Sequence, residues 1–133
     1  MSVESTRKVL EAYFAADHED TSMMADDIVF TDMASGVESH TPEGIVAMLH
    51  WFYHVAFEAT AETSQLIFTD GHAVWEGIVA GKHIGEFAGI PATHKEFRAP
   101  ICVSYDVEDD KLKRGRIYFS VASFMAQVGV TDS

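Results

Sequence analysis

The sequence predicts an α+β fold in which helices pack on one face of a strongly curved, mostly antiparallel sheet. Apolar residues recur at helical spacing in residues 2–16 and 41–57, whereas from residue 60 onward they alternate with polar residues, the period of a half-buried strand. Helices followed by a long strand meander are typical of an α+β domain. Helices laid across the concave face of a bent sheet leave a cone-shaped space, which we expect to be a ligand pocket.

Two helices and a first strand are expected in the N-terminal part of the chain. Residues 2–16 form an amphipathic helix, residues 20–25 a short second helix or a turn, and residues 28–33 the first strand. The apolar stripe of the first helix follows intervals of three, four and seven residues, and consists of Val3, Val9, Leu10, Tyr13 and Phe14.

The best-marked helix begins near Thr41 and continues to about Phe57. Thr41 can cap it, Pro42 suits its first turn, and Glu43 interacts favourably with the positive end of the helix dipole. Its broad apolar face consists of Ile45, Met48, Leu49, Phe52 and Tyr53. This helix is the element expected to cover the sheet.

The remaining chain is predicted as a strand meander. Asp70-Gly71 is the signature of a hairpin turn, and the run Glu108-Asp109-Asp110 marks a second, solvated turn. The strands are expected over residues 60–68, 73–80, 82–87, 97–107 and 111–124.

Composition narrows the class of protein. The 133 residues are enough for a single domain, residues 1–133, and 47% hydrophobic residues with 11% aromatic residues suit a core or an aromatic-walled cavity. The formal net charge of −12 argues against nucleic-acid binding, which needs basic surface. No apolar run is long enough to cross a bilayer, so we expect no membrane partner and a cytoplasmic location. The single Cys102 excludes an internal disulfide framework and a multi-thiolate metal site.

Three stretches of the chain resemble one known family. Residues 30–32 with residues 42–45 are similar to the strand-loop-helix pattern of the SnoaL-like polyketide cyclases, and residues 127–129 are similar to the family's terminal Gln-Leu-Gly. Residues 81–93, which read Gly-Lys-His-Ile-Gly-Glu-Phe-Ala-Gly-Ile-Pro-Ala-Thr, resemble the family's Gly-Thr-His-x-Gly-x-Phe-x-Gly-Ile-Pro-x-Thr-Gly motif most specifically.

The resemblance implies the cone-shaped barrel of the nuclear-transport-factor-2-like superfamily, which also houses ketosteroid isomerase and limonene epoxide hydrolase. It further implies a homodimer and acid/base chemistry. The family often carries aspartates in its last strand, one of which serves as acid/base. Ile117 and Ser120 occupy the matching positions of this chain, so the expected carboxylate is missing there.

His83 and Asp32 are the leading candidates for proton transfer. An imidazole exchanges protons near neutral pH, and His83 lies in the expected strand 82–87, which runs into the turn of residues 89–93 that contains Pro91. The alternative is a strand histidine that hydrogen-bonds this turn. Asp32 ends a strand where a carboxylate can project into the cone mouth. Its alternative is a cap on the loop of residues 34–36.

Glu76 and Tyr118 are further catalytic candidates on the late strands. Glu76 alternates with apolar residues, and a buried carboxylate is costly unless it is paired or functional. Tyr118 can stabilise an enolate by hydrogen bonding. For Glu76 the alternative is an exposed position on the convex face, and for Tyr118 it is a ring that simply packs while its hydroxyl meets solvent. A bulge of one residue would reverse either assignment.

The residues expected to contact substrate complete the candidate site. His50 and His54 stand at i and i+4, but no further acid on this helix completes a metal motif, so no metal is predicted. The expected substrate-binding residues are Trp51, His54, Trp75, Phe87, Ile117 and Ser120.

The sequence supports three hypotheses of function. The first is a cofactor-free cyclase or isomerase acting on a hydrophobic polyketide-like or terpenoid-like carbonyl compound, with His83 and Asp32 moving a proton. The second is a non-catalytic module that binds a hydrophobic small molecule, which the missing last-strand aspartates favour. The third is epoxide hydrolysis involving Arg98 or Arg116, although no acid spacing matches it.

Overall fold

The computed structural model of the protein describes residues 2–16 and 20–128. Gly129, part of the terminal stretch used in the family resemblance, lies outside the described residues. The elements along the chain are α1 (Val3–Ala15), β1 (Met24–Asp32), β2 (Glu38–His40), α2 (Thr41–His50), the π-helix η1 (Trp51–Ala56), β3 (Phe57–Thr69), β4 (His72–His83), β5 (Glu96–Glu108), β6 (Lys111–Phe119) and α3 (Val121–Val128).

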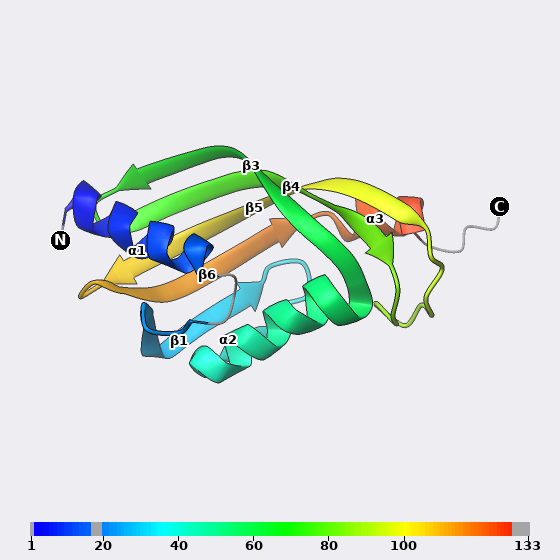
Figure 1. The fold of residues 1–133 in the computed structure, drawn as a ribbon, viewed down its shortest axis with the longest axis horizontal. Coiled ribbons are helices and arrows are strands. Elements are labelled where there is room, and N and C mark those ends of the chain that lie inside the picture. The colour runs from blue at the N-terminus through cyan, green and yellow to red at the C-terminus, as the bar shows by residue number, and fades with distance from the viewer. Residues whose placement is uncertain (1, 17–19, 129–133) are drawn as a thin grey trace.

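The six strands form one sheet in the order β2-β1-β6-β5-β4-β3. Every neighbouring pair is antiparallel except β1 with β6, which is parallel. The register shifts within the β3–β4, β5–β6 and β1–β6 pairs, and such bulges bend and twist strands. The sheet is therefore strongly curved, as predicted. Figure 1 shows α2 beside β1 on the concave side, with α1 and α3 at opposite ends of the sheet.

The helix α1 confirms the first predicted helix. Ser2 accepts a hydrogen bond from the backbone N–H of Ser5, and the Ser5 hydroxyl pairs with the Ser2 N–H in a capping box. Leu10 and Tyr13 of the predicted stripe are buried, whereas Val3 is exposed. Residues 22–23 form a turn, one of the two predicted alternatives, and Met24 and Ala25 already belong to β1.

The helix α2 begins where the sequence predicts, and its cap is built by Thr41. The Thr41 Oγ1 accepts a hydrogen bond from the Gly44 N–H at 3.1 Å, and Pro42 occupies the first turn. The helix does not stay α-helical to Phe57, because residues 51–56 form the π-helix η1. Phe57 is fully buried and already belongs to β3.

The meander differs from the prediction at its end. The Asp70-Gly71 turn joins β3 to β4 as predicted, but residues 82–87 form no separate strand. The predicted strand 111–124 ends at Phe119, and α3 follows. Ser120 explains the change, because its Oγ accepts the backbone N–H of Ser123 at 3.1 Å and thereby caps a helix.

Two clusters of buried side chains make up the core. The larger lies between the sheet, α1 and α2 and includes Tyr13, Phe30 and Tyr105. The smaller, which we call the distal cluster, packs α3 and the loop after β4 against the sheet, and consists of Ala56, Phe57, Val79, Phe87, Phe97, Ala99, Phe124 and Val128. Across the described residues, no helix combines the length and apolar character needed to span a membrane.

Candidate active site

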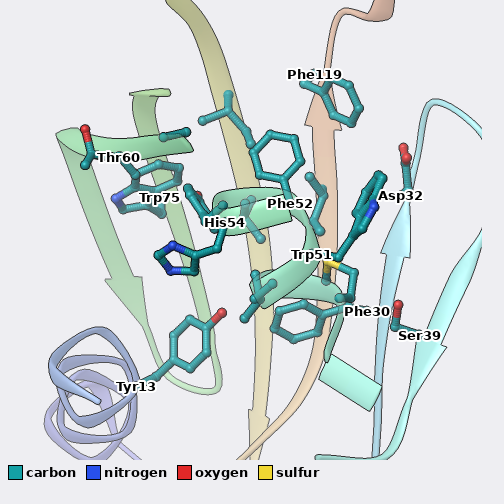
Figure 2. A pocket seen from close by; sticks show the side chains of 18 of the residues that line it. Tyr13, Phe30, Asp32, Ser39, Trp51, Phe52, His54, Thr60, Trp75 and Phe119 are labelled. Carbon is teal, nitrogen blue, oxygen red and sulfur yellow. The ribbon is translucent and has the colours of Figure 1, made fainter. Parts of the chain in front are cut away.

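A cavity of about 710 Å³ lies between the concave face of the sheet and the helical segment formed by α2 and η1. This volume is within the range of small-molecule sites. Figure 2 shows side chains from both layers pointing into it. Aromatic side chains dominate the wall: Tyr13, Phe14, Phe30, Trp51, Phe52, Tyr53, Trp75, Phe87, Tyr105 and Phe119.

The strand register explains the floor of the cavity. Trp75 pairs with Val103, Val103 pairs with Ile117, and Ile117 pairs with Asp32, so one row across four strands faces the same space. Successive side chains of a strand point to opposite faces, so the neighbours of these residues point away. The centre of the floor is apolar, and Ile117 stands there in place of a carboxylate.

Asp32 lies on the cavity wall at the end of β1. Its Oδ1 accepts hydrogen bonds from the backbone N–H groups of Ala34 at 2.9 Å and Ser35 at 3.4 Å. Both sequence interpretations of Asp32 therefore describe the same side chain, which caps the loop and also faces the cavity. Within the described part of the chain its Oδ2 makes no hydrogen bond, so this oxygen can accept a proton from a ligand.

A pair of buried phenols lies at the other end of the cavity. The Tyr13 and Tyr105 rings are 5.8 Å apart between centroids, and their hydroxyls are hydrogen-bonded. Burial raises the pKa of both well above the ordinary phenol value, and the nearby Tyr53 adds to the effect. Burial also raises the pKa of Tyr53 to about 12. At neutral pH these phenols are uncharged hydrogen-bond donors.

The carboxylate and the phenol pair are separated along and across the sheet. Tyr105 pairs with Gly115 on β6, whereas Asp32 pairs with Ile117 two residues further along. With about 4.8 Å between strands and about 3.3 Å per residue, the Cα atoms of Asp32 and Tyr105 are about 12 Å apart. A substrate can therefore lie between the two groups.

The π-helix η1 places four consecutive residues on the cavity. Trp51, Phe52, Tyr53 and His54 all line it. Single-turn π-helical segments are frequent at functional sites because they change which side chains face inward. In Figure 2 the His54 imidazole and the Tyr13 hydroxyl point into the same region.

The structure places most expected substrate-binding residues on the cavity wall, namely Trp51, His54, Trp75, Phe87 and Ile117. The expected placement of Ser120 was wrong, because Ser120 follows β6 and caps α3. The Trp75 indole is fixed by a hydrogen bond from its Nε1 to Thr63 Oγ1 at 2.8 Å.

Tyr118 and Glu76 are also not brought into the cavity. Glu76, Cys102 and Tyr118 are register partners on the convex face, and Tyr118 is 45% exposed. The physical reason is strand alternation: Trp75 and Ile117 face inward, so the residue after each faces outward. Glu76 adopts the exposed alternative that the sequence left open, and the Tyr118 side chain is exposed outside the cavity.

His83 likewise does not line the cavity. Its side chain is fully buried at the end of β4, with Nδ1 3.0 Å from Thr93 Oγ1 and the ring 5.4 Å from that of Phe57. The expected partnership with Asp32 is therefore wrong. The imidazole contacts the turn after Pro91, which is the structural alternative given above.

The basic residues considered for epoxide hydrolysis lie outside the cavity as well. Arg98 pairs with Glu62, and Arg116 pairs with Asp106. No lysine or arginine lines the cavity within residues 2–16 and 20–128. No group of three or more His, Cys, Asp or Glu side chains suited to a metal ion occurs in this described part either.

Sequence reasoning missed several wall residues, above all Tyr13, Tyr105 and Phe30. The sequence pattern shows that these side chains face inward, but an inward-facing aromatic residue is equally typical of a filled core. Tyr13 stands on the apolar stripe of α1, and Tyr105 has the same strand parity as Val103. What the sequence does not reveal is where the core stops and the cavity begins.

The curved sheet, the covering helices and the aromatic cavity define a nuclear-transport-factor-2-like fold. A family model described as SnoaL-like polyketide cyclase matches residues 7–128. The chain belongs to this SnoaL-like polyketide cyclase family.

Three solved structures show the same fold. A putative SnoaL-like polyketide cyclase from Jannaschia sp. is 12% identical, with a TM-score of 0.83 over 97% of this chain and 94% of that one. A Catenulispora acidiphila protein with a ketosteroid isomerase-like fold, in complex with trimethylamine, is 18% identical, with a TM-score of 0.72 and 95% of each chain covered. An NTF2-like protein from Burkholderia xenovorans is 15% identical, with a TM-score of 0.77 over 96% and 98%. No curated protein sequence matches the chain significantly.

Proposed function

We propose that the protein is a cyclase or isomerase that moves a proton next to a carbonyl group of an apolar, polyketide-like or terpenoid-like substrate. The observation that carries this proposal is the arrangement of the cavity, which has one carboxylate, Asp32, at one end and the buried phenols Tyr13 and Tyr105 at the other. Family membership supports a function of this type.

The wall chemistry supports a neutral, apolar substrate. Aromatic and aliphatic side chains cover most of the cavity, and among its described lining residues Asp32 is the only carboxylate and none is a lysine or an arginine. An anionic ligand would lose its hydration without gaining a cationic partner, which is costly. A folded, uncharged ring system matches the apolar wall and avoids the cost of burying an anion.

In the proposed reaction, Asp32 removes the proton from the carbon next to the carbonyl. The electron pair of the broken C–H bond forms an enolate, whose oxygen accepts a hydrogen bond from the neutral phenol pair, in which one hydroxyl already donates to the other. In an isomerisation, Asp32 returns the proton to a different carbon. In a cyclisation, the enolate carbon bonds to a second carbonyl carbon and the oxygen of that carbonyl takes the proton, so no atom or electron is gained or lost overall.

Hydrogen–deuterium exchange of α-tetralone in D₂O tests the proton-abstraction step without knowledge of the natural substrate. The wild-type protein should accelerate loss of the α-proton NMR signal. Asp32→Asn should slow the protein-dependent rate by about 100-fold or more, the range for a positioned base. Glu76→Gln is the matched control, because it removes a carboxylate from the convex face. Equal rates for Asp32→Asn and wild type would remove Asp32 from the mechanism.

The same assay tests the phenols. Tyr105→Phe removes one hydroxyl of the phenol pair and should slow exchange by about tenfold, because the Tyr13 hydroxyl then loses the hydrogen bond that supports it as a donor to the enolate. Tyr118→Phe, which removes an exposed hydroxyl outside the cavity, is the matched control and should have no effect. If Tyr105→Phe exchanges at the wild-type rate, the Tyr105 hydroxyl has no part in stabilising the enolate.

A binding module is the second candidate, and the apolar floor favours it. Val103 and Ile117 put aliphatic side chains at the centre of the cavity, so no carboxylate stands there. Such a module would bind α-tetralone, detected by quenching of tryptophan fluorescence, without accelerating its exchange. Binding without exchange would therefore replace the enzymatic proposal with this one.

A further inference from the structure

The loop between β4 and β5, residues 84–95, builds part of the cavity wall. It carries Phe87, whose ring stacks on Trp51 with centroids 6.0 Å apart and planes 24° apart. Phe87 is 9% exposed, whereas Trp51 is 40% exposed. On its other side Phe87 contacts Phe57 of the distal cluster, at 4.9 Å between centroids. Phe87 therefore separates the open cavity from the filled end of the cone.

Partly buried hydrogen bonds around His83 close the base of this loop. The His83 Nδ1 lies 3.0 Å from Thr93 Oγ1 and 3.3 Å from the Thr93 backbone nitrogen. The backbone N–H of His83 donates to the Lys95 carbonyl, and the His94 N–H donates to the His83 carbonyl. The two ends of the loop are thus held by both side-chain and backbone bonds.

Thr93 extends this network to the C-terminal helix. Its hydroxyl donates to the Val128 carbonyl of α3 at 2.7 Å. The single hydroxyl proton is used there, so the contact with His83 Nδ1 is made either by an Nδ1–H that donates to Oγ1 or by the Thr93 backbone N–H that donates to Nδ1. In both cases the imidazole must be oriented toward Thr93. Within the described part of the chain its Nε2 has no hydrogen-bond partner.

The start of the loop is fixed against the π-helix. The backbone N–H groups of Ile84 and Gly85 both donate to the Ala56 carbonyl, at 3.0 and 2.9 Å. A side chain on Gly85 would collide with the Val55 carbonyl, so the loop backbone packs directly against the backbone of η1 at this position. Since η1 also carries Trp51, both partners of the Trp51–Phe87 stack are attached to this one network.

We propose that His83 and Thr93 are positioning residues, whose partly buried hydrogen bonds hold the loop so that Phe87 closes this end of the cavity against Trp51. Residues 81–93, the most specific stretch of the family resemblance, then shape the cavity wall without contacting the reacting atoms of the substrate. The proposal rests on the proposed function only in that the cavity accepts an apolar ligand.

Substitution of Thr93 tests the proposal. Thr93→Val keeps the shape but loses the hydroxyl, and Thr93→Ser keeps the hydroxyl. Thr69→Val is the matched control, because the Thr69 hydroxyl also donates to a backbone carbonyl, at 3.2 Å, but lies outside the cavity wall. The chain has two tryptophans, so a Trp75→Phe background leaves Trp51 as the only reporter. If the Trp75→Phe background does not fold, the fluorescence of Trp51 can be obtained as the difference between the emission of a protein that keeps Trp51 and the emission of the same protein carrying Trp51→Phe.

In the ligand-free protein, Thr93→Val should shift Trp51 emission to longer wavelength and increase its quenching by acrylamide about twofold. Nile red, a neutral apolar probe, should bind about threefold to tenfold more weakly, consistent with the loss of about one partly buried hydrogen bond. Thr93→Ser should restore both signals, and Thr69→Val should change neither. The effect of Thr93→Val on Nile red should largely disappear in a Phe87→Leu background, because coupled residues are not additive.

A purely structural role would give a different result. Thr93→Val would then lower Tm while Trp51 quenching and Nile red affinity stayed at their wild-type values, and this outcome would overturn the proposal. The Trp51 signals are measured without substrate or turnover. A failure to exchange α-tetralone would therefore count against the proposed function and not against the positioning role.

Discussion

The contact between Phe30 and Gly115 offers a sharp test of how the cavity wall is packed. Phe30 of β1 lies over Gly115 of β6, its register partner. A Cβ at position 115 would lie 2.7 Å from Cδ1 and Cε1 of the Phe30 ring. Carbon atoms normally approach to about 3.5–4.0 Å, so Gly115→Ala must displace the ring by about 1 Å. The ring is 2% exposed and lies 6.2 Å from the centroids of both Tyr13 and Tyr105.

The displacement has a predictable energetic cost. Overpacking of a buried site costs about 1–3 kcal/mol, which corresponds to a fall in Tm of roughly 3–10 °C for a domain of this size. The ring can move only toward the cavity or against the two tyrosines, so affinity for Nile red should fall as well. Gly44→Ala is the matched control: its Cβ meets nothing closer than 3.4 Å, and in the helix α2 the change should stabilise by about 0.5–1 kcal/mol.

Differential scanning fluorimetry and a Nile red titration measure the two effects. Gly115→Ala should lose both stability and affinity, and a second substitution, Phe30→Leu, should recover part of the stability by making room. If Gly115→Ala kept the wild-type Tm and the wild-type Nile red affinity, the described packing of Phe30 over the sheet would be refuted.

Asp106→Asn should lower Tm at pH 7, and the difference should shrink as the pH falls below about 4. Burial is the largest single influence and acts to raise the pKa of Asp106, but the hydrogen bonds and charges of Arg116 and His72 together outweigh it and lower the pKa, so this stabilisation is lost as the pH falls through the lowered value. Urea unfolding should show stability falling above about pH 10, because burial raises the pKa of Tyr13 and Tyr105 above that of the unfolded chain; Tyr105→Phe should weaken this dependence. Calorimetry should show methyl naphthoate binding about tenfold more tightly than naphthoate, since the carboxylate would face Asp32; equal affinities would contradict the electrostatic argument.

The helices and hairpins that carry local signals could be predicted from the sequence. The Ser2 capping box, the Thr41-Pro42 start and the Asp70-Gly71 turn each act through neighbouring residues, so no tertiary information is needed. The helix α3 was missed because its apolar residues continue a strand-like pattern past Phe119. The cap residue Ser120 was the available signal, and it was assigned to the cavity instead.

The candidate site was harder to predict because facing and depth are tertiary properties. Strand alternation already implies that Ile117 and Tyr118 cannot both face the cavity, and the apolar residue is the one turned inward. Strand alternation alone does not predict that His83 lies outside the cavity, because His83 is on the same face of β4 as Trp75. It faces the concave side, but at the end of the cone that the distal cluster fills.

A crystal structure of the protein with bound α-tetralone would test the central claim most directly. The ligand should occupy the space between the sheet and η1, with its ring among the aromatic walls, its carbonyl oxygen within hydrogen-bond distance of a Tyr13 or Tyr105 hydroxyl, and its α-carbon on the side of Asp32. Ligand density elsewhere on the protein, or a ligand inside the cavity with its carbonyl directed away from these phenols, would contradict the assignment of this cavity as the site of proton transfer.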